Sequence, residues 1–297
     1  MSLRALLAAW ALTALADGAV LCAQFQLPST PPKQFGTSIS PVFEGWFDNG
    51  DGTESLLIGY YNRNTDQEVD VPIGPNNRFE PGNADMGQPT HFLTRRRHGM
   101  FVVTRPKGTG TNEKIWWVLT VNGVTNRVPF YTHPDYNLSP MTSSETSPNG
   151  GYNVPPAIRF DERGQIFKGP AATLAKAVAR TATAGVPMPL TFWVDDDALY
   201  STGTSGPMNN PAPPVNVTIS KYRGSGEITV GEARPKLEVL KGGKPLEPYT
   251  GRASTTVTFR EPGDYVLHVT ANDYSGNGGG GSGCCWTNAH IKVTVTQ

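Results

Sequence analysis

Cysteine and net charge are what this sequence has least of. Its 297 residues include only three cysteines, and 25 lysines and arginines balance 25 aspartates and glutamates. A formal net charge of zero gives no general electrostatic attraction to nucleic acids or to acidic membranes. We therefore expect no nucleic-acid partner.

Long apolar runs and common catalytic motifs are also missing. Beyond the N-terminal segment, no run approaches the roughly 18 to 20 apolar residues that cross a bilayer as a helix. We therefore expect no transmembrane segment in the mature chain. The sequence contains no Gly-x-Ser-x-Gly elbow, His-Glu-x-x-His pair or phosphate-binding loop. These absences leave open an enzyme whose catalytic residues are scattered along the chain.

Glycine and proline, by contrast, are abundant. The chain holds 33 glycines and 26 prolines, and only 17% of its residues are charged. This composition argues against long helices. The length is large for one β-sandwich and suits two, each with its own core.

The N-terminus has the pattern of a secretory signal. Arg4 precedes an apolar run over residues 5–16, and small residues follow before Ala23. This pattern predicts a cleaved signal peptide, cut after Ala23 or earlier near Ala16. A lipid anchor on Cys22 is disfavoured because a large leucine precedes the cysteine. A buried helix is disfavoured because the segment lacks a cap and runs into a proline-rich stretch.

Short apolar segments separated by turn residues fill the first half. Asn122-Gly123 stands between two alternating runs and is a strong hairpin signal, because both residues tolerate positive φ. At least six short strands predict an immunoglobulin-like sandwich, with a barrel as the alternative. The predicted strands cover residues 40–47, 55–61, 68–73, 100–104, 115–121 and 124–131.

The second half resembles a known type of module. Its segments NVPPAIRF, TATAGVPMPLTFWVDDD, STTVTFREPGDYVLHVTAND and IKVTVTQ are similar to those of PKD and cadherin-like immunoglobulin-fold repeats. The resemblance covers about residues 153–297, with an insertion at residues 199–214. It implies an extracellular module used for binding or spacing. A helix-like stretch over residues 171–179 is either a short helix or irregular structure.

The sequence thus predicts an all-β protein with two immunoglobulin-like β-sandwich domains in tandem after a cleaved signal peptide. The predicted parts are a signal peptide (1–23), a proline-rich segment (24–34), a first sandwich (35–142), a linker (143–152) and a PKD/cadherin-like sandwich (153–297).

Four aspartates at predicted strand ends form a candidate metal site. They are Asp195, Asp196, Asp197 and Asp273. Loops at the same end of a sandwich would bring these carboxylates together, and hard oxygen ligands suit calcium. The alternative is that the aspartates hydrate and cap turns.

The adjacent Cys284 and Cys285 are the only cysteines after the signal peptide. Export favours oxidation, so we expect a vicinal disulfide, although neighbouring Cα atoms lie closer than in ordinary disulfides. Two free thiols, an intermolecular disulfide or a soft-metal site with His290 are the alternatives.

Tryptophans and one basic cluster are further candidate binding residues. Trp286, Trp116 and Trp117 are candidates for stacking on sugar rings. Side chains alternate along a strand, so Trp116 and Trp117 must face opposite sides. The cluster at residues 95–98 is either a polyanion contact or a solvated loop. His268 is expected on the exposed face of its strand.

These features favour an exported, non-catalytic binding or spacer protein of the cell envelope or extracellular space. Its expected partner is an envelope or extracellular polysaccharide or protein, held by loops at the end of the second sandwich. The alternative is a secreted polysaccharide-acting hydrolase with catalytic carboxylates in the N-terminal domain.

Overall fold

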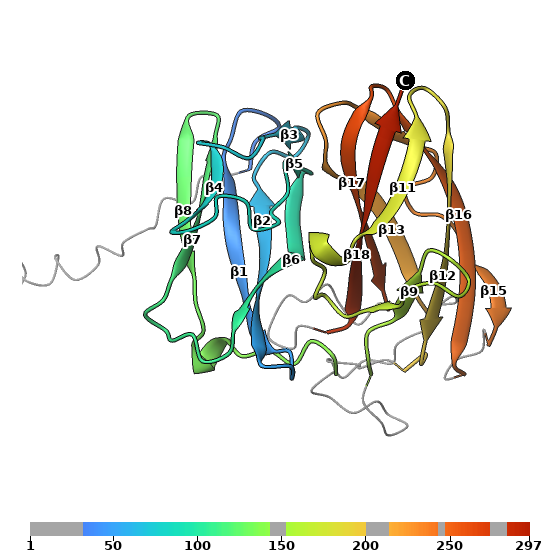
Figure 1. Ribbon diagram of the computed structural model, residues 1–297, viewed down its shortest axis with the longest axis horizontal. Coiled ribbons are helices and arrows are strands. Elements are labelled where there is room, and N and C mark those ends of the chain that lie inside the picture. The colour runs from blue at the N-terminus through green and yellow to red at the C-terminus, as the bar shows by residue number, and fades with distance from the viewer. Residues whose placement is uncertain (1–31, 143–152, 200–213, 243–246, 274–283) are drawn as a thin grey trace, which may run out of the picture. The chain divides into compact units, whose positions relative to one another are not determined.

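The regular structure of the described residues consists of β-strands and two single 3₁₀ turns (Figure 1). The computed structural model describes residues 32–142, 153–199, 214–242, 247–273 and 284–297. The predicted signal peptide and linker therefore lie outside the described residues. The prediction of an all-β protein is confirmed.

The first sandwich consists of two three-stranded sheets, with the strand orders β1-β2-β6 and β4-β7-β8. Short strands β3 and β5 pair beside them. The elements of the first sandwich are β1 (Ile39–Asp48), β2 (Thr53–Asn62), β3 (Val69–Asp70), β4 (Asn77–Glu80), β5 (His91–Phe92), β6 (Arg95–Pro106), β7 (Ile115–Val121), β8 (Val124–Phe130) and the 3₁₀ turn η1 (Pro134–Tyr136).

The hairpin predicted at Asn122-Gly123 joins β7 to β8. Asn122 has φ of 50° and Gly123 has φ of 77°. Both residues therefore adopt the left-handed conformation that this two-residue turn requires. The prediction made from these two residues is confirmed.

The second sandwich has a larger sheet in the order β10-β9-β12-β16-β14, with β15 also paired to β16, and a four-stranded sheet in the order β11-β18-β17-β13. Its elements are β9 (Ala157–Arg159), β10 (Phe167–Lys168), η2 (Leu174–Lys176), β11 (Val178–Thr183), β12 (Met188–Asp196), β13 (Asn216–Arg223), β14 (Ile228–Val230), β15 (Glu238–Lys241), β16 (Tyr249–Phe259), β17 (Gly263–Asn272) and β18 (Trp286–Thr296).

The helix considered over residues 171–179 is reduced to the single turn η2. From Val178 onward the chain is strand β11, which pairs in parallel with β18. A helix this short is marginal by itself, whereas a strand here gains a full ladder of backbone hydrogen bonds.

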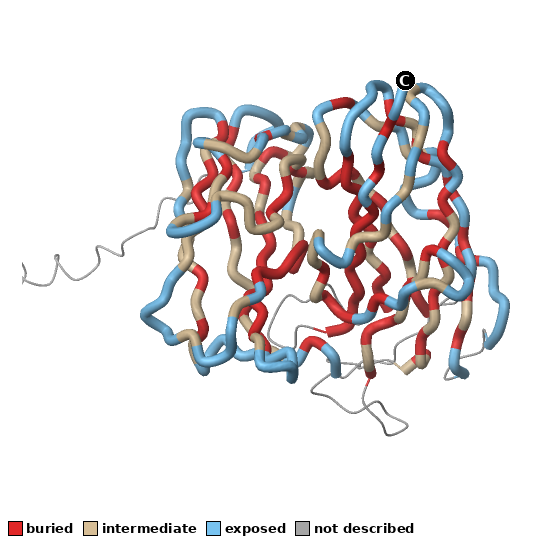
Figure 2. Tube along the Cα trace, viewed as in Figure 1, coloured by how far each residue is buried: buried red, intermediate tan, exposed pale blue. Residues whose placement is uncertain are grey.

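The four sheets stack as four layers. Leu56 and Ile58 of β2 face the core of the first sandwich, whereas Leu57 between them packs with Val102 on Trp286 of the second sandwich. The middle sheets are therefore covered on both faces, and Figure 2 shows buried residues running through β2, β17 and β18.

Polar contacts join the two sandwiches as well. Arg223 of β13 bonds both carboxylate oxygens of Asp85, at 2.7 and 2.9 Å. The hydroxyl of Tyr222 donates to the carbonyl oxygen of Gly87 at 2.6 Å, and Lys221 lies 3.1 Å from a carboxylate oxygen of Asp70. The two ion pairs are charge-assisted, and together with the Tyr222 bond they hold one sandwich in register on the other.

Candidate functional site

The four candidate aspartates lie at the end of the second sandwich but do not all face one another. Strand alternation turns Asp195 away from Asp196. The two oxygens of Asp195 accept hydrogen bonds from Arg159 at 2.7 Å and from Thr250 at 2.8 Å. Asp195 is therefore held in a surface ion pair and a hydroxyl bond.

Asp196 and Asp273 are both buried, with exposed fractions of 7% and 0%. Burial, followed by the nearby charges of Asp273 and Asp197, raises the pKa of Asp196 to about 8. One oxygen of Asp196 accepts from the amide of Ala198 at 2.8 Å, and the other has no hydrogen-bond partner among the described residues. Asp273 accepts from the side-chain amide of Asn153 at 2.6 Å.

Asp197 accepts hydrogen bonds from the backbone amides of Val154 and Leu199. Burial raises its pKa as well. Within the described ranges, no group of three or more histidine, cysteine or acidic side chains is arranged to hold a metal ion. The main feature of this end is thus a pair of buried carboxyl groups, Asp196 and Asp273, in which the charge of Asp273 raises the pKa of Asp196. The calcium site stays a prediction.

Cys284 and Cys285 are joined by a disulfide and are buried, with exposed fractions of 3% and 0%. Their sulfurs lie 3.9 and 3.6 Å from the carbonyl oxygen of Asn153. Because Asn153 also bonds Asp273, the disulfide packs next to the acidic pair.

The tryptophans do not form an open platform. Trp117 is fully buried and donates from Nε1 to Asn77 at 2.8 Å, whereas the guanidinium of Arg127 lies 3.7 Å above the ring of Trp116. The expected alternation of the two residues is confirmed. Trp286 is only 2% exposed, so its ring has no open face for a sugar.

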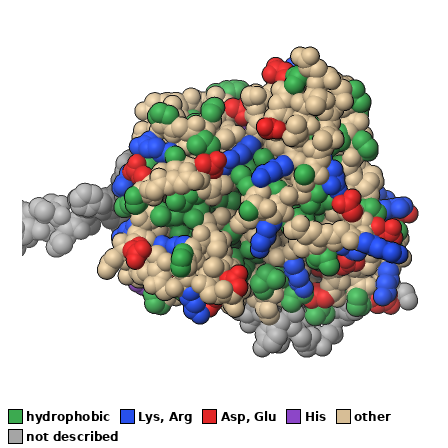
Figure 3. All heavy atoms as spheres, viewed as in Figure 1, with side chains coloured by type: hydrophobic (Ala, Val, Ile, Leu, Met, Phe, Trp, Pro, Cys, Tyr) green, Lys and Arg blue, Asp and Glu red, His purple; other side chains and the backbone are tan. Residues whose placement is uncertain are grey.

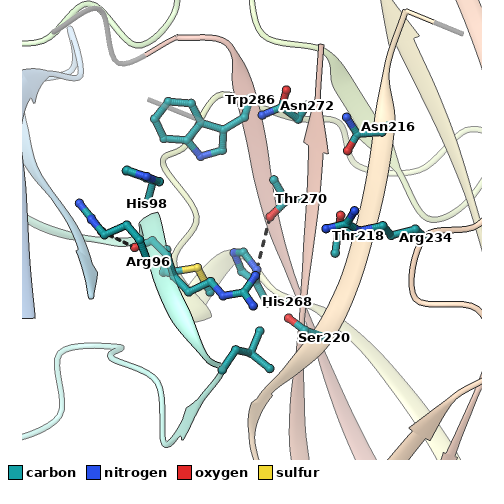
Figure 4. Close-up of a pocket in the computed structure, with 13 residues that line it drawn as sticks. Arg96, His98, Asn216, Thr218, Ser220, Arg234, His268, Thr270, Asn272 and Trp286 are labelled. Atoms are coloured by element: carbon teal, nitrogen blue, oxygen red, sulfur yellow. Dashed lines mark hydrogen bonds between the residues drawn. The ribbon is translucent and has the colours of Figure 1, made fainter. Parts of the chain in front are cut away.

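A cleft of about 610 Å³ lies between the two sandwiches. Alternate residues of β13 and β17 supply one side, because positions two apart on a strand share a face. The start of β6 supplies the other. Figure 4 shows Arg96 and His98 across from Asn216, Thr218, Ser220 and Arg234, with His268 and Thr270 between them. The lining residues are Leu93, Arg96, Arg97, His98, Met100, Asn216, Thr218, Ser220, Arg234, His268, Thr270, Asn272 and Trp286.

The charge of this cleft has one sign. Its lining includes three arginines and no aspartate or glutamate. Arg96 pairs with Glu44 at 2.5 Å, whereas Arg97 and Arg234 form no salt bridge with any described residue. On the face shown in Figure 3, basic and acidic side chains are intermixed. The cleft therefore concentrates positive charge in a chain whose formal net charge is zero.

Glu44 is the buried counter-charge behind the cleft wall. Burial alone would raise its pKa, but the neighbouring His98 and Arg96 outweigh burial and lower it. The amide of Gly99 also donates to the same carboxylate, at 3.1 Å. Glu44 thus fixes Arg96 at the rim of the cleft.

The expectation that His268 is exposed is wrong, since only 4% of the residue is exposed. Its ring stacks on Tyr222, with centroids 5.7 Å apart, and lies 5.3 Å from the ring of His290. Burial, followed by the charge of Arg97, lowers the pKa of His268 to about 4. The prediction assumed that alternate residues of this strand face solvent, but both faces of β17 are covered. The continuous apolar run at residues 265–267 was the signal of a strand covered on both sides.

Several carboxylates of the first sandwich form salt bridges with basic side chains. Glu54 pairs with Arg105 at 2.8 Å, and Glu80 pairs with both Arg78 and Arg127. Asp48 contacts Lys107. Wherever a carboxyl pKa in the described part of this sandwich is shifted, the shift is downward, as in Glu44, Asp48, Asp51, Glu68, Asp70, Glu80 and Asp85. A general acid needs the opposite shift.

No protein-family model matches the sequence, and no curated protein matches it. Among solved structures, the chain is similar to domains 4 and 5 of the S-layer protein SbsC. The sequence identity is 13% and the TM-score is 0.22, over 88% of this chain and 98% of that one. A likeness of this size carries no argument about function. In the part of the chain that the structure describes, no helix is long and apolar enough to cross a membrane.

Proposed function

We propose that this protein is an exported, non-catalytic binding module that takes an anionic ligand in the cleft between its two sandwiches. The observation that carries the proposal is the lining of the cleft, with three arginines and no carboxylate. Arginine presents a planar fork of donors that matches a carboxylate or another oxyanion. Two of these guanidinium groups, on Arg97 and Arg234, form no salt bridge with any described residue, although the charge of Arg97 acts on Glu68 from farther away.

A rigid pair of walls supports binding, because a preformed site loses little conformational entropy when its ligand arrives. The ion pair of Arg223 with Asp85 and the apolar cluster around Trp286 hold the two sandwiches together. The volume of about 610 Å³ lies within the usual range of small-ligand sites.

Export is supported by the sequence pattern of residues 1–23 and by the paired cysteines, since disulfides persist outside the cytosol. An anionic component of the envelope or of the extracellular medium is the corresponding partner. The sequence predicted that the ligand binds at the loops at the end of the second sandwich, whereas this proposal puts the ligand in the cleft.

Calorimetric titration of the mature protein with citrate tests the proposal. We expect Arg97→Gln with Arg234→Gln to weaken binding at least tenfold, and added salt to weaken binding to the unsubstituted protein. The matched control is Arg252→Gln with Arg260→Gln, which removes the same charge from two exposed ion pairs with glutamates. Equal binding by both double variants, or no binding at all, would overturn the proposal.

A further inference from the structure

The geometry points to a carboxylated saccharide, such as an oligouronate, as the ligand of the cleft. This inference rests on the proposed function and specifies the ligand of the same site. A simple anion site needs only the arginines. This cleft also presents an ordered set of hydroxyl and amide groups.

The polar groups form rows across two paired strands. Asn216 of β13 lies opposite Asn272 of β17, Thr218 lies opposite Thr270, and Ser220 lies opposite His268. Successive rows are about 7 Å apart, because two residues of a strand span that distance. A ligand that uses several rows must therefore carry hydrogen-bonding groups along its length.

Three of these groups are available to a ligand. The side chains of Asn216, Thr218 and Ser220 make no hydrogen bond to any described residue, and each is partly exposed. Thr270, by contrast, donates to Asn288 at 3.1 Å and is therefore already engaged. The available groups thus lie on β13, the edge strand of its sheet.

The chemistry of the two sets of groups is complementary. A hydroxyl both donates and accepts, as does a side-chain amide, and this suits the hydroxyls of a sugar. A guanidinium only donates, which suits a carboxylate. Leu93 and Met100 add apolar surface for the C–H groups of a sugar ring. A carboxylated saccharide combines all three features.

The test compares three probes by calorimetric titration: trigalacturonate, neutral maltotriose and citrate. We expect trigalacturonate to bind at least tenfold more tightly than either of the other two. Thr218→Val with Ser220→Ala removes two hydroxyls with little change in shape. We expect it to weaken trigalacturonate binding about tenfold, because two hydrogen bonds to the ligand are lost, while citrate binding stays unchanged.

The matched control is Thr191→Val with Ser254→Ala, because these residues form an exposed hydroxyl pair on β12 and β16, 2.9 Å apart. We expect no change in any affinity.

Equal affinities for citrate and trigalacturonate, or equal loss in the cleft variant and its control, would overturn the saccharide assignment and leave the anion site standing. Failure of every anionic probe would overturn both proposals. A sulfated trisaccharide serves as a fourth probe, and tighter binding of it than of trigalacturonate would also overturn the assignment to carboxylate. Single substitutions at Thr218 and Ser220 serve if the double variant unfolds.

Discussion

The side chain of Asn288 donates a hydrogen bond to the backbone carbonyl oxygen of Gly99, 189 positions earlier in the sequence. Asn288 is 2% exposed, and its own oxygen accepts from Thr270. At Gly99 strand β6 passes so close to β18 that an added Cβ would lie 2.6 Å from the ring of Trp286. These two residues therefore fix the distance between the walls of the cleft.

Asn288→Ala is expected to lower the free energy of unfolding by about 1–3 kcal/mol, because the carbonyl of Gly99 would lose a buried partner. Urea unfolding followed by tryptophan fluorescence measures the change. Asn76→Ala, at an exposed position, is the control and should shift the same quantity by less than about 0.5 kcal/mol. Equal effects of the two substitutions would show that the interface bond contributes nothing.

Gly99→Ala is expected to lower the free energy of unfolding by about 2–5 kcal/mol. Two effects add up: alanine is unfavourable at a positive φ, and its Cβ overpacks against Trp286. Gly108→Ala separates the two causes. Gly108 also has a positive φ, of 86°, but nothing lies within 4 Å of its added Cβ. Thermal unfolding should show a clearly smaller loss for Gly108→Ala, and a similar loss would contradict the packing argument.

Asp196→Asn is expected to stabilise the protein at high pH. The folded state holds a proton on Asp196 up to about pH 8, whereas an unfolded aspartate releases it near pH 4. Stability from this group therefore falls as pH rises from about 4 to 8. The free energy of unfolding of Asp196→Asn should therefore exceed that of the unsubstituted protein by about 1–3 kcal/mol at pH 8.5 and by little at pH 4.5.

Calcium provides a second measurement on the same pair. If a cation binds between Asp196 and Asp273, calcium should raise the melting temperature of the unsubstituted protein at pH 8 and should not raise that of Asp196→Asn. Identical melts in chelator and in millimolar calcium would contradict the predicted calcium site. Asp195→Asn is the control, because its partners are Arg159 and Thr250.

His290→Phe is expected to reduce the loss of stability in mild acid. Burial, the neighbouring His268 and Arg223 lower the pKa of His290 well below its usual value, and both ring nitrogens lack a hydrogen-bond partner among the described residues. Below about pH 6.5, His290 is therefore protonated in the unfolded state and stays neutral in the folded state. Stability from His290 is complete above this pH and is lost as pH falls.

The measurement is the melting temperature between pH 5 and 7, where carboxylates with lowered pKa values do not titrate. Phenylalanine keeps a ring against Tyr222, which lies 4.5 Å from the ring of His290. We expect a shallower dependence on pH in the variant. His133→Phe, at a partly exposed turn, is the control and should leave the slope unchanged. An unchanged slope for His290→Phe would rule out the buried histidine as its cause.

Local patterns in the sequence determined the strands of this protein. Asn122-Gly123 specifies its hairpin because few residues accept positive φ, and the alternation of Trp116 with Trp117 assigns opposite faces because strand geometry allows nothing else. These signals act over a few residues and are therefore readable from one chain.

Only the tertiary structure decided which outer faces meet. Alternation tells the two faces of β17 apart but does not say that β6, far away in sequence, covers the second face. His268 and Trp286 are consequently buried, and Arg97 and Arg234 line one cleft. The physical reason is that packing between sheets depends on the complementarity of whole surfaces, and this is a property of residues that the chain brings together only when it folds.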